Sequence, residues 1–321
     1  MRRQVKRVLF VLVQVGIISA CVFYALKYLD VPRVLAALAQ VPVWKVFCVF
    51  LFQASLAWVA TPLRIYFLCR FEPPLATVVQ ALGLGQFLNL ILPAKLGEAA
   101  KLALLRRVLP DGLAGATEIV FWERFFDLNA LLTLALISGA LMGSTTFSAP
   151  LGLLVLGIWG AVFALEYWWP LVERLMGRLP WPRLTAYFSG IATALQHRLS
   201  LRFALSMGGL TLILWGGEVL MQGIMLSVAF GFDLTPAQIL VTAVVGMAGL
   251  SAPATPGSIG VYEAAMVASL TAFGQPKEES LAAALLMHAI MILPVLLIGL
   301  WAMLSVGFRA ALRLSETAPD K

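Results

Sequence analysis

Charged residues, histidine and cysteine are all scarce in this 321-residue sequence, and each shortage excludes a class of protein. Only 12% of the residues are charged and 61% are hydrophobic, whereas soluble chains average about 25% charged and about 45–50% apolar residues. This excess of apolar side chains predicts a polytopic membrane protein. The three cysteines have no CxxC spacing, which argues against a disulfide framework or a zinc site. The two histidines are too few and too scattered for a histidine-rich metal centre.

Motifs for catalysis are missing as well. Walker and dinucleotide glycine patterns are absent, and no serine, cysteine or histidine set has the spacing of a nucleophilic site. We therefore expect no cofactor, no metal and no catalytic residue. The net charge of +7 does not indicate nucleic acid as a partner, because the basic residues cluster beside apolar segments, where membrane orientation and anionic headgroups explain them.

Six segments are long and apolar enough to cross a bilayer as helices, which takes about 20 residues. The first can also be read as a signal peptide, but its apolar stretch exceeds the about 7–15 residues of a signal h-region, which favours an uncleaved span. The six segments cover roughly residues 8–28, 44–68, 115–141, 149–169, 203–229 and 280–305.

Two shorter apolar segments each end at a break rich in proline and glycine, and a further short helical piece follows. Hydrocarbon tolerates such a break only where protein or a wet cavity satisfies the backbone. We interpret both as re-entrant hairpins, although eight ordinary spans with proline kinks fit the hydropathy too. The entering arms are 76–92 and 236–252, and the returning arms are about 97–107 and 260–273.

The order span, broken hairpin, span occurs twice, about 44–141 and about 203–305, and the segment 149–202 connects the two copies. An odd number of crossings between them gives the copies opposite orientations, the inverted-repeat plan of many secondary transporters. Residues 1–321 are thus predicted to form a single all-α transmembrane domain of about six full spans and two re-entrant hairpins.

Most of the 23 basic residues then lie on the cytoplasmic side or in the hairpin that enters from it. This bias places the protein in the cell (inner) membrane with both termini cytoplasmic. The basic stretch 170–202 is expected to be an amphipathic helix on the cytoplasmic face, and Trp168, Trp169 and Trp181 fit an interfacial belt.

The two breaks form the first candidate site. Each leaves the N-terminus of a short helix inside the membrane, where free N–H groups and the helix dipole favour a phosphate or carboxylate. The alternative is that proline and glycine merely end helices, while Lys95 pairs with Glu98 and Lys101 snorkels towards the cytoplasm. The candidate substrate-binding residues are Asn89, Lys95, Gly97, Glu98, Lys101, Pro256, Gly257, Gly260 and Glu263.

The third span carries a second group of candidate binding residues, Glu123, Arg124 and Asp127. Helical spacing places them on one broad polar face. A charge in mid-membrane costs about 2.5–3.5 kcal/mol on the insertion scale, so these side chains need partners. One reading is a structural ion-pair network with Lys95, Glu98 or Lys101, and the other is headgroup binding or proton coupling.

Glu218 in the fifth span completes the candidate set, with Gln222 one helical turn further on. A buried carboxylate at this place can exchange a proton, or it can stay neutral and hydrogen-bonded while the neighbouring glycines serve close helix packing. Both readings remain open.

Three motifs in this order resemble the flippase-like family that includes the membrane region of lysylphosphatidylglycerol synthases, over roughly residues 8–305. They are Asn89-x3-Pro93-Ala94-Lys95-Leu96-Gly97-Glu98-x2-Lys101, Glu123-Arg124-x2-Asp127 and Pro253-x2-Pro256-Gly257-x2-Gly260-Val261-x-Glu263. The resemblance implies movement of a lipid between leaflets, with the matching residues as its polar centre. Arginine is common in the family where this chain has Lys95 and Lys101.

These observations favour a membrane lipid translocase for an anionic phospholipid or a polyprenyl-phosphate-linked lipid. No aminoacyl-transferring domain follows the last span, which argues against aminoacyl-lipid synthesis by this chain alone. The alternatives are a membrane-embedded enzyme that modifies lipid headgroups, with Glu98 or Asp127 as acid or base, and a non-transporting subunit that recruits a cytoplasmic transferase through residues 170–202.

Overall fold

The computed structural model describes residues 30–92, 96–176, 178, 182–251 and 255–316, and within these ranges the chain is helical and contains no strand. The predicted first span at 8–28 and the candidate residue Lys95 lie outside the described residues.

Five helical segments are long and apolar enough to cross a membrane, and they coincide with the five other predicted spans. One of them, α8, ends at Phe163 and not near residue 169, because the chain turns at Ala164 and begins a separate helix. The five are Val43–Leu68 (α3 Val43–Ser55, η1 Leu56–Ala60 and α4 Thr61–Leu68), Gly112–Leu141 (α7), Thr145–Phe163 (α8), Leu201–Ala229 (α11 Leu201–Gly223 and η3 Ile224–Ala229) and Lys277–Val306, which is part of α14 (Lys277–Glu316).

The two shorter apolar helices of the predicted hairpins are confirmed as well. They are α5 (Leu75–Ile91) and α12 (Pro236–Ser251), and they precede the short helices α6 (Gly97–Leu105) and α13 (Val261–Ala272). A short helix, α2 (Val31–Gln40), was not expected from the sequence. The Asp30 carboxylate accepts a hydrogen bond from the Arg33 N–H, and a proline in the first turn fits this helix start.

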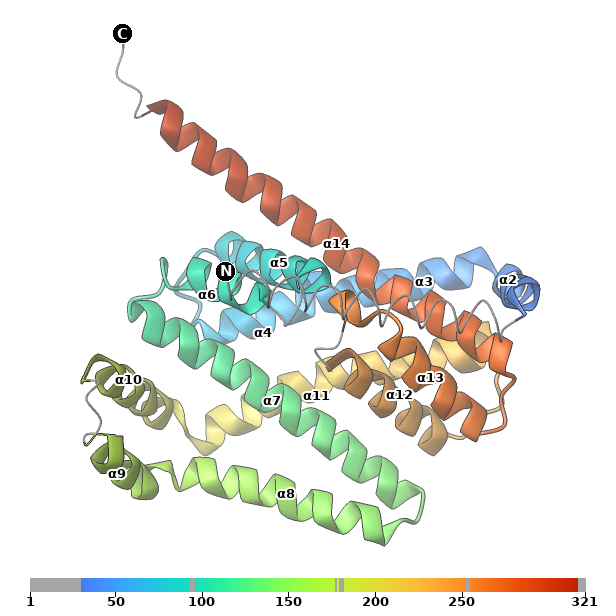
Figure 1. The fold of residues 1–321 in the computed structure, drawn as a ribbon, viewed down its shortest axis with the longest axis horizontal. Helices are drawn as coiled ribbons and strands as arrows, with labels where there is room; N and C mark the ends of the chain where they lie inside the picture. The colour runs from blue at the N-terminus through green and yellow to red at the C-terminus, as the bar shows by residue number, and fades with distance from the viewer. Residues whose placement is uncertain (1–29, 93–95, 177, 179–181, 252–254, 317–321) are drawn as a thin grey trace, which may run out of the picture. The chain divides into compact units, whose positions relative to one another are not determined.

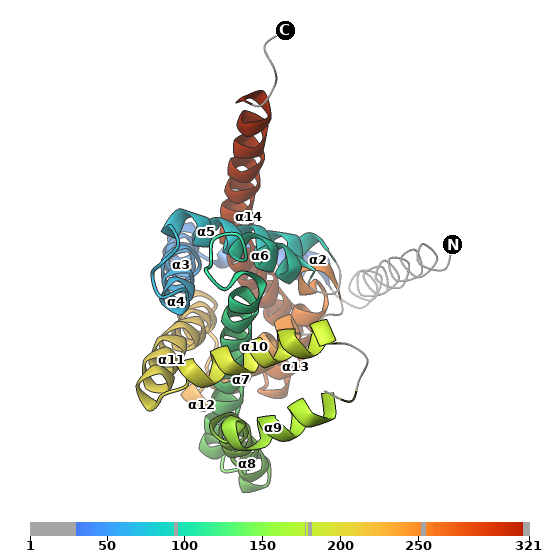
Figure 2. The ribbon, with the colours of Figure 1, turned by 90° about the vertical axis from the view of Figure 1, so that its left-hand side faces the viewer.

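The predicted amphipathic segment 170–202 consists of two helices, not one, α9 (Leu165–Met176) and α10 (Pro182–Arg198). They contact each other, and they also contact α8 and α7 respectively. Figures 1 and 2 show α9 and α10 lying across the ends of α7 and α8, roughly perpendicular to them. This orientation is the one expected for helices that lie along a membrane surface next to spanning helices.

The chain divides into two compact units. Unit 1 comprises Met1–Ala60, Val79–Lys101 and Gly217–Lys321, and unit 2 comprises Thr61–Val78 and Leu102–Gly216. Both Pro/Gly breaks fall in unit 1, whereas the charged face of α7 falls in unit 2.

In unit 1, α13 packs between α12 and α14 (Figure 1). The α12–α13 pair is an antiparallel hairpin whose helices approach closely at two glycines. A Cβ added to Gly246 would lie 2.6 Å from Met266 Sδ, and one added to Gly249 would lie 3.2 Å from Ala265 Cβ. Further along, the buried hydroxyls of Thr242 and Ser269 are hydrogen-bonded at 2.9 Å.

The two ends of this hairpin lie together, because Gln275 Nε2, just after α13, donates to the Asp233 carbonyl, just before α12. The chain therefore leaves the hairpin where it entered it.

The α5–α6 hairpin of unit 1 is packed even more tightly. A Cβ added to Gly97 would lie 1.9 Å from the Gly85 carbonyl oxygen and 2.6 Å from Asn89 Oδ1. One added to Gly85 would lie 3.1 Å from the Lys101 Cβ. These contacts pair the end of α5 with the start of α6, so α6 runs back along α5.

Unit 2 is built on α7, which packs against α8, α10 and α4. Edge-on ring contacts join Trp122 and Phe125 of α7 to neighbouring helices, with Phe125 4.9 Å from Trp159 and Trp122 5.1 Å from Phe203 between ring centroids. Such aromatic pairs add stabilisation of about 0.5–1.5 kcal/mol each beyond the area that they bury.

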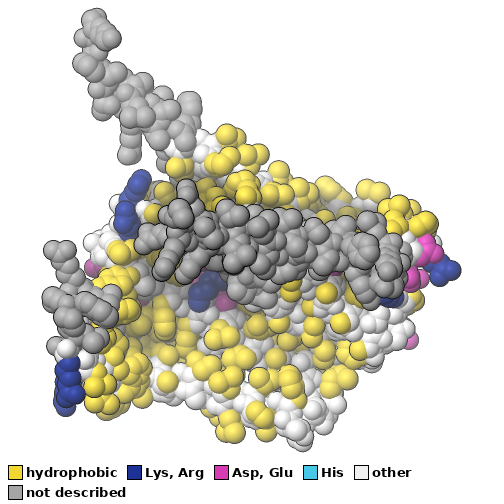
Figure 3. Space-filling view, viewed as in Figure 1, with side chains coloured by type: hydrophobic (Ala, Val, Ile, Leu, Met, Phe, Trp, Pro, Cys, Tyr) yellow, Lys and Arg dark blue, Asp and Glu magenta, His cyan; other side chains and the backbone are white. Residues whose placement is uncertain are grey.

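Hydrophobic side chains are exposed over much of the visible face (Figure 3). None of the residues of α8 is buried, and its apolar side chains Leu153 and Leu156 are about 70% exposed. In water such a surface is an association hazard, whereas lipid is a suitable neighbour for it. Together with the five apolar helices, it identifies a polytopic integral membrane protein.

Candidate functional site

The tips of the two hairpins are in contact inside unit 1. The ideal Cβ position of Gly257, in the second break, lies 3.6 Å from the carbonyl oxygen of Leu90 at the end of α5. Gly257 has φ +60° and Gly260 has φ +85°, values that glycine adopts without strain. The predicted break residues Pro256, Gly257 and Gly260 thus form a tight turn against the end of the first hairpin.

Side chains of the second break satisfy part of its interrupted backbone. Thr255 Oγ1 donates to the Ile259 carbonyl at 2.8 Å, and Ser258 Oγ donates to the Leu250 carbonyl at 3.0 Å. These bonds meet the requirement that protein satisfies a helix interrupted at membrane depth.

The first hairpin holds a polar group made of Asn89, Glu98 and Lys101, of which Lys101 is buried. The Glu98 carboxylate pairs with Lys101 Nζ at 2.7 Å and accepts a hydrogen bond from Asn89 Nδ2 at 3.2 Å. The Lys101 side chain is 4% exposed, so its charge lies inside the protein. Close packing of α6 on α5 at Gly97 holds this cation in the hairpin, where Glu98 compensates its charge.

Glu263 of α13 is held by two donors. Its Oε2 accepts from the Gly260 N–H at 2.7 Å, and its Oε1 lies 2.6 Å from His288 Nδ1 of α14. The carboxylate therefore caps the N-terminus of α13 from within the chain. The Tyr262 ring packs on the imidazole with 4.7 Å between ring centroids.

Glu218 of α11 has a weaker set of contacts. Gln53 Nε2 of α3 donates to Glu218 Oε1 at 3.0 Å. Glu218 Oε2 and both polar atoms of the fully buried Gln222 have no hydrogen-bond partner within the described part of the chain. Buried polar atoms usually have partners, so this group of unpartnered atoms requires an explanation.

In unit 2, Asp127 of α7 is the centre of a network across three helices. Its Oδ1 accepts from Arg64 Nη1 of α4 at 2.6 Å and from Trp215 Nε1 of α11 at 3.1 Å, and Arg124 lies 3.7 Å from its Oδ2. Arg64 is 5% exposed. Asp127 therefore has partners other than Lys95, Glu98 or Lys101, the partners considered from the sequence.

Arg124 differs from the other charged groups of this network, because its side chain is 51% exposed while the adjacent Glu123 side chain is 4% exposed. Arg124 Nη2 pairs with Glu123 Oε1 at 2.7 Å. At about 1.5 Å per residue the guanidinium lies about 18 Å along α7 from Gly112. A partly exposed cation at this position in an apolar helix is placed to meet an anion.

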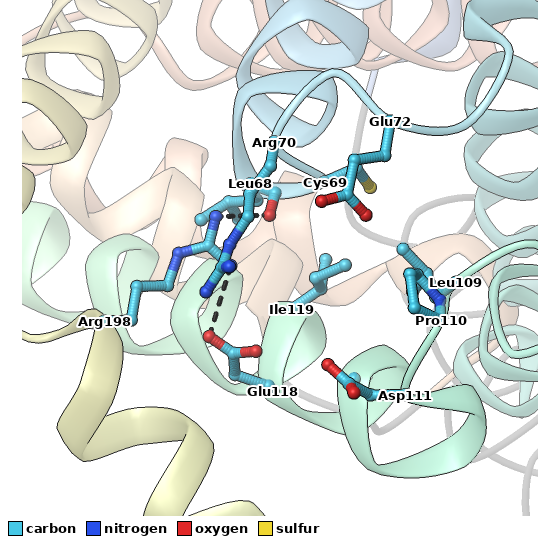
Figure 4. Close-up of a pocket in the computed structure, with 11 residues that line it drawn as sticks. Leu68, Cys69, Arg70, Glu72, Leu109, Pro110, Asp111, Glu118, Ile119 and Arg198 are labelled. Atoms are coloured by element: carbon cyan, nitrogen blue, oxygen red, sulfur yellow. Dashed lines mark hydrogen bonds and ion pairs between the residues drawn. The ribbon is translucent and has the colours of Figure 1, made fainter.

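Unit 2 contains a cavity of about 170 Å³ between the segment that precedes α5 and the segment that follows α6. Glu72, just before α5, and Asp111, just after α6, both line it (Figure 4). Arg198 crosses one side, where it pairs with Glu118 at 3.2 Å and donates to the Leu68 carbonyl.

Cys69, which also lines this cavity, follows the end of the span Val43–Leu68. Burial raises the pKa of its thiol to about 12. The group is therefore a neutral thiol at physiological pH and a poor nucleophile.

Sequence reasoning identified the buried acids but missed their partners Arg64, Arg198, His288 and Gln53. Arg64 and Arg198 are basic residues near the ends of apolar runs, so in the sequence they look like the other basic residues of the cytoplasmic side. Only the need of each intramembrane acid for a partner signals that such residues exist.

The comparisons with known proteins agree with the fold. Residues 11–299 match the family described as the lysylphosphatidylglycerol synthase TM region. Neither the curated proteins nor the solved structures contain a significant match. Because the match covers most of the sequence, the chain belongs to the family of lysylphosphatidylglycerol synthase transmembrane regions.

Proposed function

We propose that the chain is a lipid translocase that moves an anionic phospholipid or a polyprenyl-phosphate-linked lipid between leaflets of the inner membrane. The headgroup would pass through a polar site while the acyl or prenyl tails stay in the bilayer. The proposal treats the two hairpins as re-entrant, the repeats as inverted and both termini as cytoplasmic.

The observation that supports this function most is the contact between the two hairpin tips at Leu90 and Gly257. Discontinuous helices that meet in this way are the common substrate-binding device of secondary transporters. The Lys101–Glu98 pair, of which Lys101 is buried, lies in the first hairpin, so a charged side chain is already accommodated next to the break.

The half-exposed guanidinium of Arg124 gives the proposal its headgroup chemistry. Arginine binds phosphate in a bidentate manner, and such charge-assisted bonds are about twice as strong as neutral ones. In this proposal Arg124 exchanges its contacts with Glu123 and Asp127 for the phosphate of the lipid. The candidate residues Asn89, Lys95, Glu98, Lys101, Glu218 and Glu263 would line the route of the headgroup.

The proposal assigns transport, not aminoacyl transfer, to this chain, because the family match is to the transmembrane region.

The test is lipid exchange in vesicles that contain the purified protein and a phospholipid with a fluorescent label on its headgroup. A membrane-impermeant quencher reports how much label reaches the outer leaflet. We expect exchange by the wild type and its loss in Arg124→Ala and in Lys95→Ala. Arg33→Ala is the matched control, because the Arg33 side chain is 76% exposed and pairs with the neighbouring Asp30, away from the candidate site.

The site is supported if the wild type and Arg33→Ala exchange lipid equally well and Arg124→Ala folds normally but does not exchange lipid. Equal exchange by wild type and Arg124→Ala would rule out this role of Arg124.

A further inference from the structure

Glu218 differs from the three acidic side chains of α7 in having no basic partner within the described residues. Glu118 pairs with Arg198, Glu123 with Arg124 and Asp127 with Arg64. Within the part of the chain that the structure describes, Glu218 has no ion pair and accepts only the amide hydrogen bond of Gln53.

The surroundings of Glu218 supply little that would stabilise a negative charge. Met221 and Met225, on the same helical segment, belong to an apolar core in which both are fully buried. A Cβ on the neighbouring Gly217 would lie 3.0 Å from Leu56, so apolar atoms also approach the backbone beside Glu218. A carboxylate without a counter-charge in such a setting is far less favourable than a carboxylic acid.

The unpartnered atoms around Glu218 fit a protonated carboxyl group. Glu218 Oε2 is buried and has no donor within the described residues. Gln222 lies one turn further along the same face of α11, and its amide oxygen is also buried without a partner. A proton on Oε2 would turn that atom into a donor, and the Gln222 and Gln53 amide oxygens are the unpartnered acceptors of this region.

A second proton-exchanging group lies in the same core. The Glu263 carboxylate is paired with His288 Nδ1, which leaves His288 Nε2 and the Tyr262 hydroxyl buried without partners. Tyr262 belongs to the same buried core as Met221, which follows Glu218 on α11. Glu218, Tyr262 and His288 therefore each have one buried polar atom without a partner within the described residues, and all three belong to unit 1.

The other elements packed against α11 and η3 in unit 1 add few charges. This segment contacts α3, η1, α12 and α14. On α3 the nearest basic group is Lys45, whose Nζ donates to the Val228 carbonyl. No titratable residue occurs in the sequences of η1 and α12, and α14 presents His288, with Lys277, Glu278 and Glu279 at its N-terminal end.

We propose that Glu218 is a proton-binding site, and that reversible protonation of its Oε2 drives lipid movement. In the bound state a proton taken from water makes Glu218 a neutral acid, and its release returns the carboxylate; no bond other than O–H forms or breaks. The Tyr262–His288–Glu263 group donates this proton to Glu218 and accepts it back. Proton binding stands on the geometry of unit 1 alone, whereas its coupling to lipid movement rests on the proposed function.

Proton binding is tested without transport, by pH-difference infrared spectroscopy of the purified full chain in lipid nanodiscs. We expect the C=O band of a protonated carboxylic acid in the wild type, its loss in Glu218→Gln and its retention in Glu279→Gln, the same change at an exposed position. Glu218→Asp, as a second variant, should keep a shifted band. Absence of the band in the wild type, or an unchanged band in Glu218→Gln, would overturn the proposal.

Coupling is tested by lipid exchange across vesicles with an imposed pH gradient. For one proton per lipid, a gradient of one pH unit should shift the steady-state leaflet ratio up to about tenfold, since one unit corresponds to a factor of ten. In Glu218→Gln the shift should disappear, whereas in Glu279→Gln, the same change at an exposed position, the shift should persist. If the leaflet ratio of the wild type did not change with the gradient, the coupling would be overturned. If the infrared band were present but no lipid exchange occurred, the proposed function would be overturned and the proton-binding site would still be supported.

Discussion

Replacing Gly97 by alanine is the sharpest test of the first hairpin. The added methyl group would lie 1.9 Å from the Gly85 carbonyl oxygen and 2.8 Å from the Asn89 nitrogen. Both atoms belong to the backbone of α5, so no side chain can rotate away to relieve the clash. The substitution therefore requires α6 to move away from α5 as a whole.

The expected cost follows from these distances. Overpacking a filled site typically costs about 1–3 kcal/mol, and a backbone clash of this depth belongs at the upper end of that range. The better helix propensity of alanine recovers at most about 1 kcal/mol in a helix interior, and less at the first residue of α6. We expect Gly97→Ala to destabilise the protein by about 2 kcal/mol and to separate Lys101 from the end of α5.

Thermal unfolding of the purified protein measures the stability, and lipid exchange measures the activity. Gly157→Ala is the matched control, because an added Cβ at this position of α8 has no heavy atom within 4 Å. The control should be as stable as the wild type or slightly more stable. If Gly97→Ala were as stable and active as Gly157→Ala, the close packing of α6 on α5 would be refuted.

Two further predictions concern unit 2. Arg64→Met should destabilise the protein by about 3–5 kcal/mol in thermal or denaturant unfolding, because it leaves Asp127 without its principal cation. The double variant with Asp127→Leu should recover part of this loss of stability. Equal stability of Arg64→Met and the wild type would contradict the buried ion pair. The Cys69 thiol should react slowly with maleimide at neutral pH and faster as the pH rises towards its pKa of about 12, because only the thiolate is nucleophilic; rapid labelling at neutral pH in the folded protein would contradict its burial.

The hairpins were predictable because their signals are local. A run of about 16 apolar residues is too short for an ordinary span, and proline followed by glycine ends a helix wherever it occurs. The bounds of α5 and α12 agree with the predicted 76–92 and 236–252 to within about a residue, which is the usual uncertainty of helix ends.

The partners of the buried acids were not predictable, because pairing depends on which helices pack together. Asp127 clearly needed a cation, yet nothing in the sequence selects Arg64 over Lys101. His288 is separated from Glu263 by 25 positions and became recognisable only when α13 was seen to pack on α14. The helix α2 carried a local signal, an aspartate followed by a proline, but it is too short to stand out in a hydropathy profile.

The central claim is that both hairpins enter the membrane and return to the side from which they came, each from a different side. Single cysteines placed just outside the hairpins test it directly, in a protein whose own cysteines are replaced by serine. Glu72→Cys and Asp111→Cys flank the first hairpin, and Asp233→Cys and Gln275→Cys flank the second. An impermeant thiol reagent added to one side of oriented vesicles should label the first pair together and leave the second pair unlabelled, with the reverse result from the other side. Labelling of the two members of a pair from opposite sides would contradict the account, because that hairpin would then cross the membrane.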